Sequence, residues 1–258
     1  MKEVWPLSHL TLRVLDLEGQ ADFYGRFGLT ELQRSDSESV LGSGEKPLLR
    51  LVRLAGGSPR PARSAGLYHF ALLLPSEEDL GSFVLHAGRA RLPFVGAGDH
   101  LVSQALYFQD PEDNGIEVYA DRPRETWDWS RGQLAMGTLP VDLDRLAGLA
   151  REDWRGLPEG TLLGHMHLNV ADLDRSQAYY EGLGMELIAS LPSARFLAWD
   201  RYHHHLGINL WRGAGVQPVA PDVAGLESFS VRRPGLAPVT PDPDGVLVTT
   251  VPQPARIA

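Results

Sequence analysis

Residues 7–17 read LSHLTLRVLDL, and residues 163–173 read LGHMHLNVADL. At an offset of 156 positions the two stretches share histidine, leucine, valine, aspartate and leucine in the same places. Each has the apolar residues of a strand, and its aspartate is a typical first residue of a helix. Gly28 and Gly184 follow at matching positions, where a helix ends in a positive-φ conformation. An internal repeat of this kind predicts a fold built from duplicated units.

A second kind of unit begins at residues 66–70 (GLYHF) and again at residues 225–229 (GLESF). The first copy is complete, with a strand at 67–74, a helix near 77–88 and strands near 103–109 and 115–120. The second copy is shortened, because a proline-rich stretch at 237–244 runs directly into a strand at 245–251. Such a stretch leaves no room for the helix.

The repeats predict an α+β fold of four βαβββ units, the last one without its helix. A linker at 123–160 separates an N-terminal pair of units (1–122) from a C-terminal pair (161–258), and it contains a short helix near 141–151. The expected units are 1–60, 61–122, 161–213 and 221–258.

Composition excludes several classes of function. The 258 residues carry a net charge of −9 and have a pI near 5.4, so nucleic acid and anionic membrane surfaces are not expected partners. There is no cysteine, so any metal must be held by histidine, carboxylate or backbone oxygen. No apolar run approaches the length of a membrane span, and the opening MKEVWPLSHL has no apolar signal core. We therefore expect a cytoplasmic protein.

One stretch is more specific than the repeats. Residues 98–117 read GDHLVSQALYFQDPEDNGIE, and their Gly-Asp-His, Leu-Tyr, Asp-Pro and Glu resemble the extradiol dioxygenase sequence pattern. That pattern has glycine or proline where this chain has Asp113, in a turn that tolerates aspartate. As a whole the chain resembles the vicinal oxygen chelate superfamily, which includes glyoxalases, antibiotic-resistance proteins and extradiol dioxygenases. With residues 66–70 and 202–205 included, it is most similar to the catechol 2,3-dioxygenase branch.

The resemblance implies that pairs of units form two curved sheets, each shaped as a cup, and that the first strand of a unit can supply a metal ligand. Ligand positions of the family are occupied here by His9, His69, His165 and Glu117. The family's acid/base histidine corresponds to His204. Pairing units one and two omits this histidine, and pairing units three and four gives no set of three ligands. Only units two and three together supply everything, which leaves the fourth unit to close the other cup against unit one.

The resemblance therefore implies a metal site of His69, Glu117 and His165 that holds Fe(II), with Mn(II) as the second choice, and no organic cofactor. A set of two histidines and one carboxylate leaves positions open for substrate and O2. The expected partners are an aromatic diol and O2. His204 is the expected acid/base, Tyr107 is expected to donate a hydrogen bond to a substrate oxygen, and His100 is expected on the loop over the substrate.

The remaining histidines have simpler interpretations. We expect a structural or vestigial role for His9, and we expect His167 to point to the opposite strand face from His165. The same alternation is expected to separate His204 from His203 and His205, which would lie in a second layer or at the surface.

Two other functions remain open. One is a lyase or isomerase of the glyoxalase kind, which usually has more carboxylate ligands and no equivalent of His204. The other is a metal-free protein that binds a small molecule. The sequence leaves the ring substituents of the substrate and the presence of a homo-oligomer open.

Overall fold

The structure, a computed structural model, describes residues 5–151, 153–218, 220–233 and 240–251. The four expected units contain the following helices and strands. The first unit contains β1 (Leu7–Val14), α1 (Leu17–Gly25), β2 (Thr30–Arg34), β3 (Glu38–Ser43) and β4 (Lys46–Arg53). The second contains β5 (Gly66–Leu73), α2 (Glu77–Arg89), β6 (Phe94–Asp99), β7 (Ser103–Gln109) and β8 (Gly115–Asp121).

The third unit repeats this order with β9 (Leu162–Asn169), α4 (Leu173–Gly182), β10 (Glu186–Leu191), β11 (Ala194–Ala198) and β12 (Leu206–Asn209). The described residues of the fourth unit contain only strands, which are β13 (Gly225–Val231), β14 (Thr240–Pro241) and β15 (Leu247–Thr250). Part of the proline-rich stretch that was predicted to replace the helix, residues 237–239, lies outside the described residues. The predicted linker contains η1 (Arg124–Thr126) and α3 (Leu143–Gly148).

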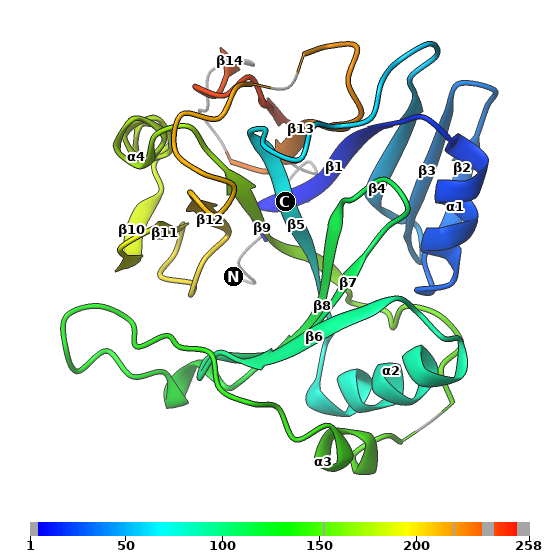
Figure 1. Cartoon of the computed structure of the whole chain (residues 1–258). Helices are drawn as coiled ribbons and strands as arrows, with labels where there is room; N and C mark the ends of the chain where they lie inside the picture. Colours follow the sequence, from blue (N-terminus) through cyan, green and yellow to red (C-terminus); the bar gives the residue numbers. More distant parts are fainter. Residues whose placement is uncertain (1–4, 152, 219, 234–239, 252–258) are drawn as a thin grey trace, which may run out of the picture.

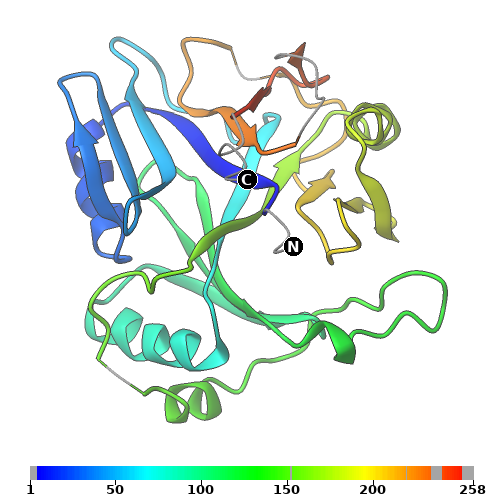
Figure 2. The same ribbon diagram turned by 180° about the vertical axis from the view of Figure 1, so that it is seen from behind.

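The strands form two sheets, and each sheet takes one unit from each half of the chain. The seven-stranded sheet has the order β14-β15-β13-β1-β4-β3-β2, and the eight-stranded sheet has the order β10-β11-β12-β9-β5-β8-β7-β6. Units two and three therefore share one sheet and units one and four share the other, as predicted. Figure 1 shows β1, β5 and β9 near the middle of the molecule, and Figure 2 shows the same arrangement from behind. The α+β fold of two curled sheets is confirmed.

The helices begin where the sequence predicted. Asp16 and Asp172 each cap the first turn of a helix, because their carboxylates accept hydrogen bonds from Gly19 N and Arg175 N. Gly28 and Gly184 have φ values of 96° and 83°, which a residue with a Cβ rarely adopts. Figure 1 shows α1 beside β2–β4 and α2 next to α3, and α2 packs against β8 of the other sheet. Among the described residues, no helix is long and apolar enough to cross a membrane.

Candidate metal centre and substrate pocket

The central strands of the eight-stranded sheet place the predicted ligands in two adjacent rows. Ala71 on β5 pairs with His165 on β9 at one side and with Glu117 on β8 at the other. In the next row, His69 pairs with His167. Residues two apart on a strand share a face, so all of these side chains project from the same face. The small side chain of Ala71, which is fully buried, leaves the space over the middle strand free for His165 and Glu117 to converge.

The three predicted ligands meet at one carboxylate oxygen. The Nε2 atoms of His69 and His165 lie 3.0 Å and 3.1 Å from Oε2 of Glu117, and all three residues are buried. Ligand atoms that bind one ion at about 2.1 Å and at right angles lie about 3 Å apart, so this spacing fits a shared metal. The buried Nε2 of His69 also has no partner with hydrogen-bond geometry among the described residues. A metal would satisfy this atom.

The charges in this cluster suit ligation. Burial alone would raise the pKa of Glu117, but His165 and His69 outweigh it and hold that pKa well below its usual range. Burial lowers the pKa of His165 to about 4, although Glu117 acts in the opposite direction. At neutral pH the structure therefore holds a carboxylate beside a neutral imidazole, and these are the forms that bind metals.

His167 belongs to this cluster, contrary to prediction. A ligand atom of His167 lies within 4.8 Å of one from His69 and one from His165. The prediction that His167 points away from His165 is wrong, because residues 165 and 167 are two apart on β9 and so share a face. His69, His165 and His167 thus form a second, wider set of potential ligands. In the set with Glu117, both histidine nitrogens lie within 3.1 Å of the carboxylate oxygen.

His204, the expected acid/base, lies beside the ligand cluster. Its ring centroid is 4.1 Å from that of His165, and its Nε2 atom is 3.0 Å from Nε2 of His167. His203 and His205 are almost completely buried, so a surface position is excluded for both. The alternation expected of residues 203–205 does not apply, because they lie in an irregular stretch just before β12. Burial lowers the pKa of His204 well below its usual value, so its imidazole is neutral.

Tyr107 and His100 are joined by a short hydrogen bond. The backbone oxygen of Gly137 can only accept, so Nδ1 of His100 donates to it over 2.8 Å. In a neutral ring Nε2 is then an acceptor, and the Tyr107 hydroxyl donates to it over 2.6 Å. Burial and the charge of Glu117 raise the pKa of Tyr107 well above its usual value, so its hydroxyl keeps its proton. Tyr107, the partner of Glu117 across β7 and β8, thus lies at the rim of the ligand cluster.

A cavity of about 560 Å³ opens over the cluster, a volume typical of small-molecule sites. His69, Tyr107, Glu117, His167 and His204 line its floor, together with His100. Its walls are mainly apolar and include Val95, Phe108, Ile116, Met136, Leu191 and Phe196. Part of the wall comes from the linker, whose residues 136–138 contact the cavity.

His9 takes no part in this site. It lies on β1 in the seven-stranded sheet, where its Nε2 and Nδ1 atoms are 3.3 Å from Ser230 Oγ and 3.2 Å from Ser8 Oγ. These contacts join His9 to two serine hydroxyls of its own sheet. The equivalent position on β13 is Ser228, and Leu247 on β15 takes the position that corresponds to Glu117.

Comparison with known proteins supports the resemblance. A protein of Bacillus subtilis (strain 168) named catechol-2,3-dioxygenase is 38% identical over 239 residues, which cover 88% of this chain and 82% of that protein. The family model of the glyoxalase/bleomycin resistance protein/dioxygenase superfamily matches residues 7–118. The chain belongs to this superfamily.

Solved structures show the superfamily fold over almost the whole chain. A putative dioxygenase from Bacillus subtilis superposes with a TM-score of 0.61 at 13% identity, covering 98% of this chain and 87% of that one. Glyoxalase I from Zea mays gives a TM-score of 0.57 at 18% identity, covering 95% and 92%. At these identities the similarity concerns the fold alone.

Sequence reasoning missed several residues around this superfamily site. His167 could have been found from its spacing to His165. Residues 136–138 could not, because nothing in the linker's composition indicates that it crosses the pocket. Asp121 was also missed. Its carboxylate accepts a 3.0 Å contact from His203, and this contact depends on an irregular loop.

Proposed function

We propose that this protein is an extradiol ring-cleaving dioxygenase that holds Fe(II) on His69, Glu117 and His165 and cleaves a catechol with O2. The observation that carries the proposal is the convergence of two buried imidazole nitrogens, at 3.0 Å and 3.1 Å, on one oxygen of Glu117 beneath the pocket. The relative named catechol-2,3-dioxygenase supports the same reaction class.

The donor set favours iron. Two neutral imidazoles and one carboxylate on one face are the ligands of non-haem Fe(II) oxygenases, with Mn(II) as the second choice. Such an ion, when bound, supplies Lewis acidity and a path for electrons between the substrate and O2. With a divalent ion bound, the single negative charge of Glu117 would leave the ion and its protein ligands with a net charge of only +1.

The residues around the ligands handle the substrate. His204 is neutral and lines the pocket, so it can take a proton from a catechol hydroxyl and return it to an oxygen later in the reaction. Tyr107 keeps its hydroxyl proton, which it donates to His100 in this structure. To serve the substrate, the hydroxyl must turn its proton from His100 to a substrate oxygen, while the hydrogen bond to Gly137 keeps His100 in place. The apolar walls exclude water from the ring, and the volume leaves room for a ring substituent.

The glyoxalase alternative has less support at this site. That class usually has more carboxylate ligands, whereas the groups beside Glu117 are His69, His165 and His167. It also has no equivalent of His204. A metal-free binding protein would have no need for two buried imidazoles that converge on a buried carboxylate.

The test begins with the metal content of anaerobically purified protein. We expect about one iron per chain after Fe(II) reconstitution and a yellow ring-fission product when catechol is added in air. A panel of small catechols then shows which substituents are accepted. Iron-loaded protein that gives no coloured product with any member of the panel would contradict the proposal.

Two matched variants test the ligand set. His165→Ala should abolish iron retention, because it removes one of three protein ligands. His9→Ala, which removes a strand histidine from the other sheet, should leave iron content and turnover unchanged. If His9→Ala loses iron and His165→Ala retains it, the metal lies in the seven-stranded sheet and the proposal is wrong.

A further inference from the structure

We propose that Asp121 and His203 are positioning residues that fix the tautomer of His204, so that Nε2 of His204 faces the pocket without a proton. This inference rests on the proposed function, in which His204 is the acid/base. It assigns a task to two residues that do not line the pocket and are not among the proposed ligands.

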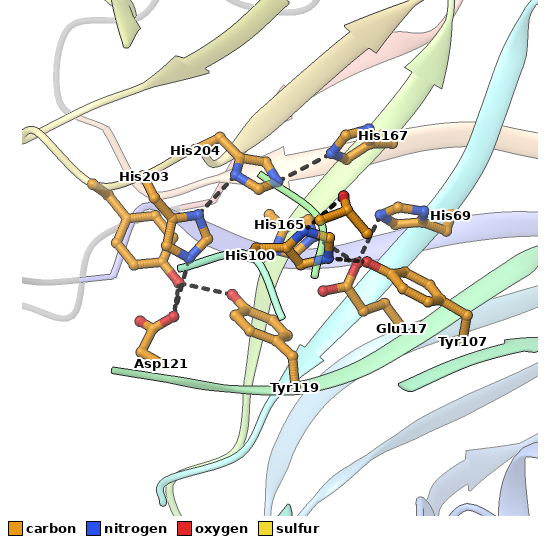
Figure 3. A network of polar contacts seen from close by, with 12 residues as sticks. His69, His100, Tyr107, Glu117, Tyr119, Asp121, His165, His167, His203 and His204 are labelled. Atoms are coloured by element: carbon orange, nitrogen blue, oxygen red, sulfur yellow. Dashed lines mark hydrogen bonds and ion pairs between the residues drawn. The ribbon is translucent and has the colours of Figure 1, made fainter. Parts of the chain in front are cut away.

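A chain of hydrogen-bonding groups runs from Asp121 to the pocket (Figure 3). Nε2 of His203 lies 3.0 Å from Oδ1 of Asp121, and Nδ1 of His203 lies 2.7 Å from Nδ1 of His204. On its other side, Nε2 of His204 lies 3.0 Å from Nε2 of His167. The chain therefore connects Asp121 to the pocket through the two ring nitrogens of His203 and the two of His204.

The carboxylate decides the direction of every bond in this chain. An ionised carboxylate only accepts, so Nε2 of His203 must carry the proton in the first bond. Nδ1 of a neutral His203 is then an acceptor, and Nδ1 of His204 must donate to it. This leaves Nε2 of a neutral His204 as the acceptor that faces the pocket. His167 fits the same direction, because its Nε2 can donate while its Nδ1 has no hydrogen-bond partner among the described residues.

Two tyrosine hydroxyls support the role of Asp121 as a hydrogen-bond acceptor. The Tyr202 hydroxyl donates to the same Oδ1 atom over 3.1 Å, and the Tyr119 hydroxyl lies 2.8 Å from that of Tyr202. One oxygen of Asp121 therefore receives two donors. The ring of His203 is held between its neighbours, with its centroid 4.0 Å from that of Tyr202 and 5.4 Å from that of Trp127. These contacts keep the ring of His203 from turning over and reversing the chain.

The consequence lies in the pocket. A catechol hydroxyl that reaches Nε2 of His204 meets a lone pair and can transfer its proton there. With the other tautomer the same atom would present an N–H group, which cannot accept a proton. In this arrangement a substrate hydroxyl replaces His167 as the donor to Nε2.

The tautomers can be measured without turnover. The full chain is labelled with ¹⁵N in its histidine rings, kept free of paramagnetic metal, and its signals are assigned with His203→Gln and His204→Gln. We expect a protonated Nε2 and a bare Nδ1 in His203, and a protonated Nδ1 and a bare Nε2 in His204. A protonated Nε2 on His204 in the unmodified protein would overturn the inference.

Two substitutions of Asp121 sharpen this test. In Asp121→Ala the acceptor is lost, so the His204 signals should change to a mixture of tautomers or to the opposite one. In Asp121→Asn the amide oxygen can still accept from His203 and Tyr202, so the original tautomer should persist. His204 signals that remain unchanged in Asp121→Ala would also overturn the inference.

Kinetics on iron-loaded protein supply the second readout. Asp121→Ala should lower kcat roughly 10²-fold, the lower end of what a positioned acid/base contributes, while iron content and KM stay close to normal. Asp121→Asn should recover most of this loss, and Asp128→Ala, a change at an exposed acidic residue of the linker, should have no effect. An equal kcat in Asp121→Ala and the unmodified enzyme would contradict the assigned role.

The two proposals fail in different ways. If the unmodified protein cleaves no catechol, the proposed function falls, and the ring-nitrogen signals still decide whether Asp121 sets the tautomer. If catechol is cleaved but the tautomer is the opposite one, only the present inference falls.

Discussion

The hydroxyl of Tyr24 on α1 donates a 2.7 Å hydrogen bond to the buried carboxylate of Asp110, in the turn before β8. The bond joins unit one to unit two, and therefore one sheet to the other. The third and fourth units repeat it, because the Tyr180 hydroxyl on α4 donates to Asp242 over the same distance. The two bonds tie each sheet to the other at equivalent places.

A second contact accompanies each of these bonds. The carboxylate of Glu112 accepts from Leu15 N at 2.9 Å, and that of Asp244 accepts from Ala171 N at 3.3 Å. Leu15 and Ala171 occupy the same place in the repeated sequence, just before the helix-capping aspartates. The junction between neighbouring units is thus part of the repeat.

Tyr24→Phe should lower the free energy of unfolding by about 1–3 kcal/mol, because it leaves the buried Asp110 without one of its donors. Burial already raises the pKa of Asp110, and the Tyr24 hydrogen bond partly counteracts this effect. Chemical denaturation gives the free energy. Tyr68→Phe serves as the control, since Tyr68 is 37% exposed and its change should stay within about 0.5 kcal/mol. If both variants lost the same free energy of unfolding, the hydrogen bond from Tyr24 to Asp110 would make no specific contribution to stability.

Ala71→Val should reduce iron binding although Ala71 is not a ligand. The added methyl groups occupy the space over β5 where His165 and Glu117 converge, and overpacking of this kind also costs about 1–3 kcal/mol of stability. Iron content after reconstitution is the measurement. Ala71→Gly keeps that space free and should still bind iron. A full iron content in the valine variant would mean that the ligands do not meet over Ala71.

Glu117→Gln and His167→Gln distinguish the two possible ligand sets. We expect Glu117→Gln to abolish iron retention, because it removes the only anionic ligand of the proposed set. His167→Gln should retain iron but change the rate of turnover, since His167 contacts His204. The reverse result, with iron lost in His167→Gln and kept in Glu117→Gln, would assign the metal to the three histidines.

Metal-free protein should lose stability as the pH falls below neutrality. Burial lowers the pKa of His165 from 6.5 to about 4, and it lowers the pKa values of His167, His204 and His205 well below the usual value. Below pH 6.5 the unfolded chain therefore binds protons that the native protein does not. The free energy of unfolding then decreases with falling pH, by up to about 1.4 kcal/mol per pH unit for each histidine.

Denaturation at pH 7 and at pH 5.5, in the presence of a chelator, measures this dependence. His205→Gln should make it shallower, because one of the four histidines no longer takes up a proton on unfolding. A free energy of unfolding that is the same at both pH values would show that these imidazoles are not held neutral.

The sequence was sufficient for the repeated units and for their pairing across the two halves of the chain. Both follow from local patterns, because each unit carries its own strand, capping aspartate and closing glycine. The pairing of units two and three followed from asking which ligands could meet, and the observed order of β9-β5-β8 agrees with it.

The details around the ligands depend on register and on loops, which local patterns do not encode. Nothing in the sequence indicates that Ala71 lies between His165 and Glu117, since this needs the pairing of three strands. The irregular path of residues 203–205 likewise depends on packing against Asp121 and Trp127. His167 is different, because correct use of the two-residue strand period would have placed it beside His165.

Because each sheet contains strands from both halves of the chain, neither half can form a complete sheet alone. A cut within the linker would separate the half that carries β1 and β5 from the half that carries β13 and β9, and each half would expose bare strand edges. His69 and Glu117 would be on one fragment and His165 on the other. In the intact chain the linker acts as a tether that raises the effective concentration of one half near the other. Reassembly of the two separated fragments would be visible as the recovery of iron binding.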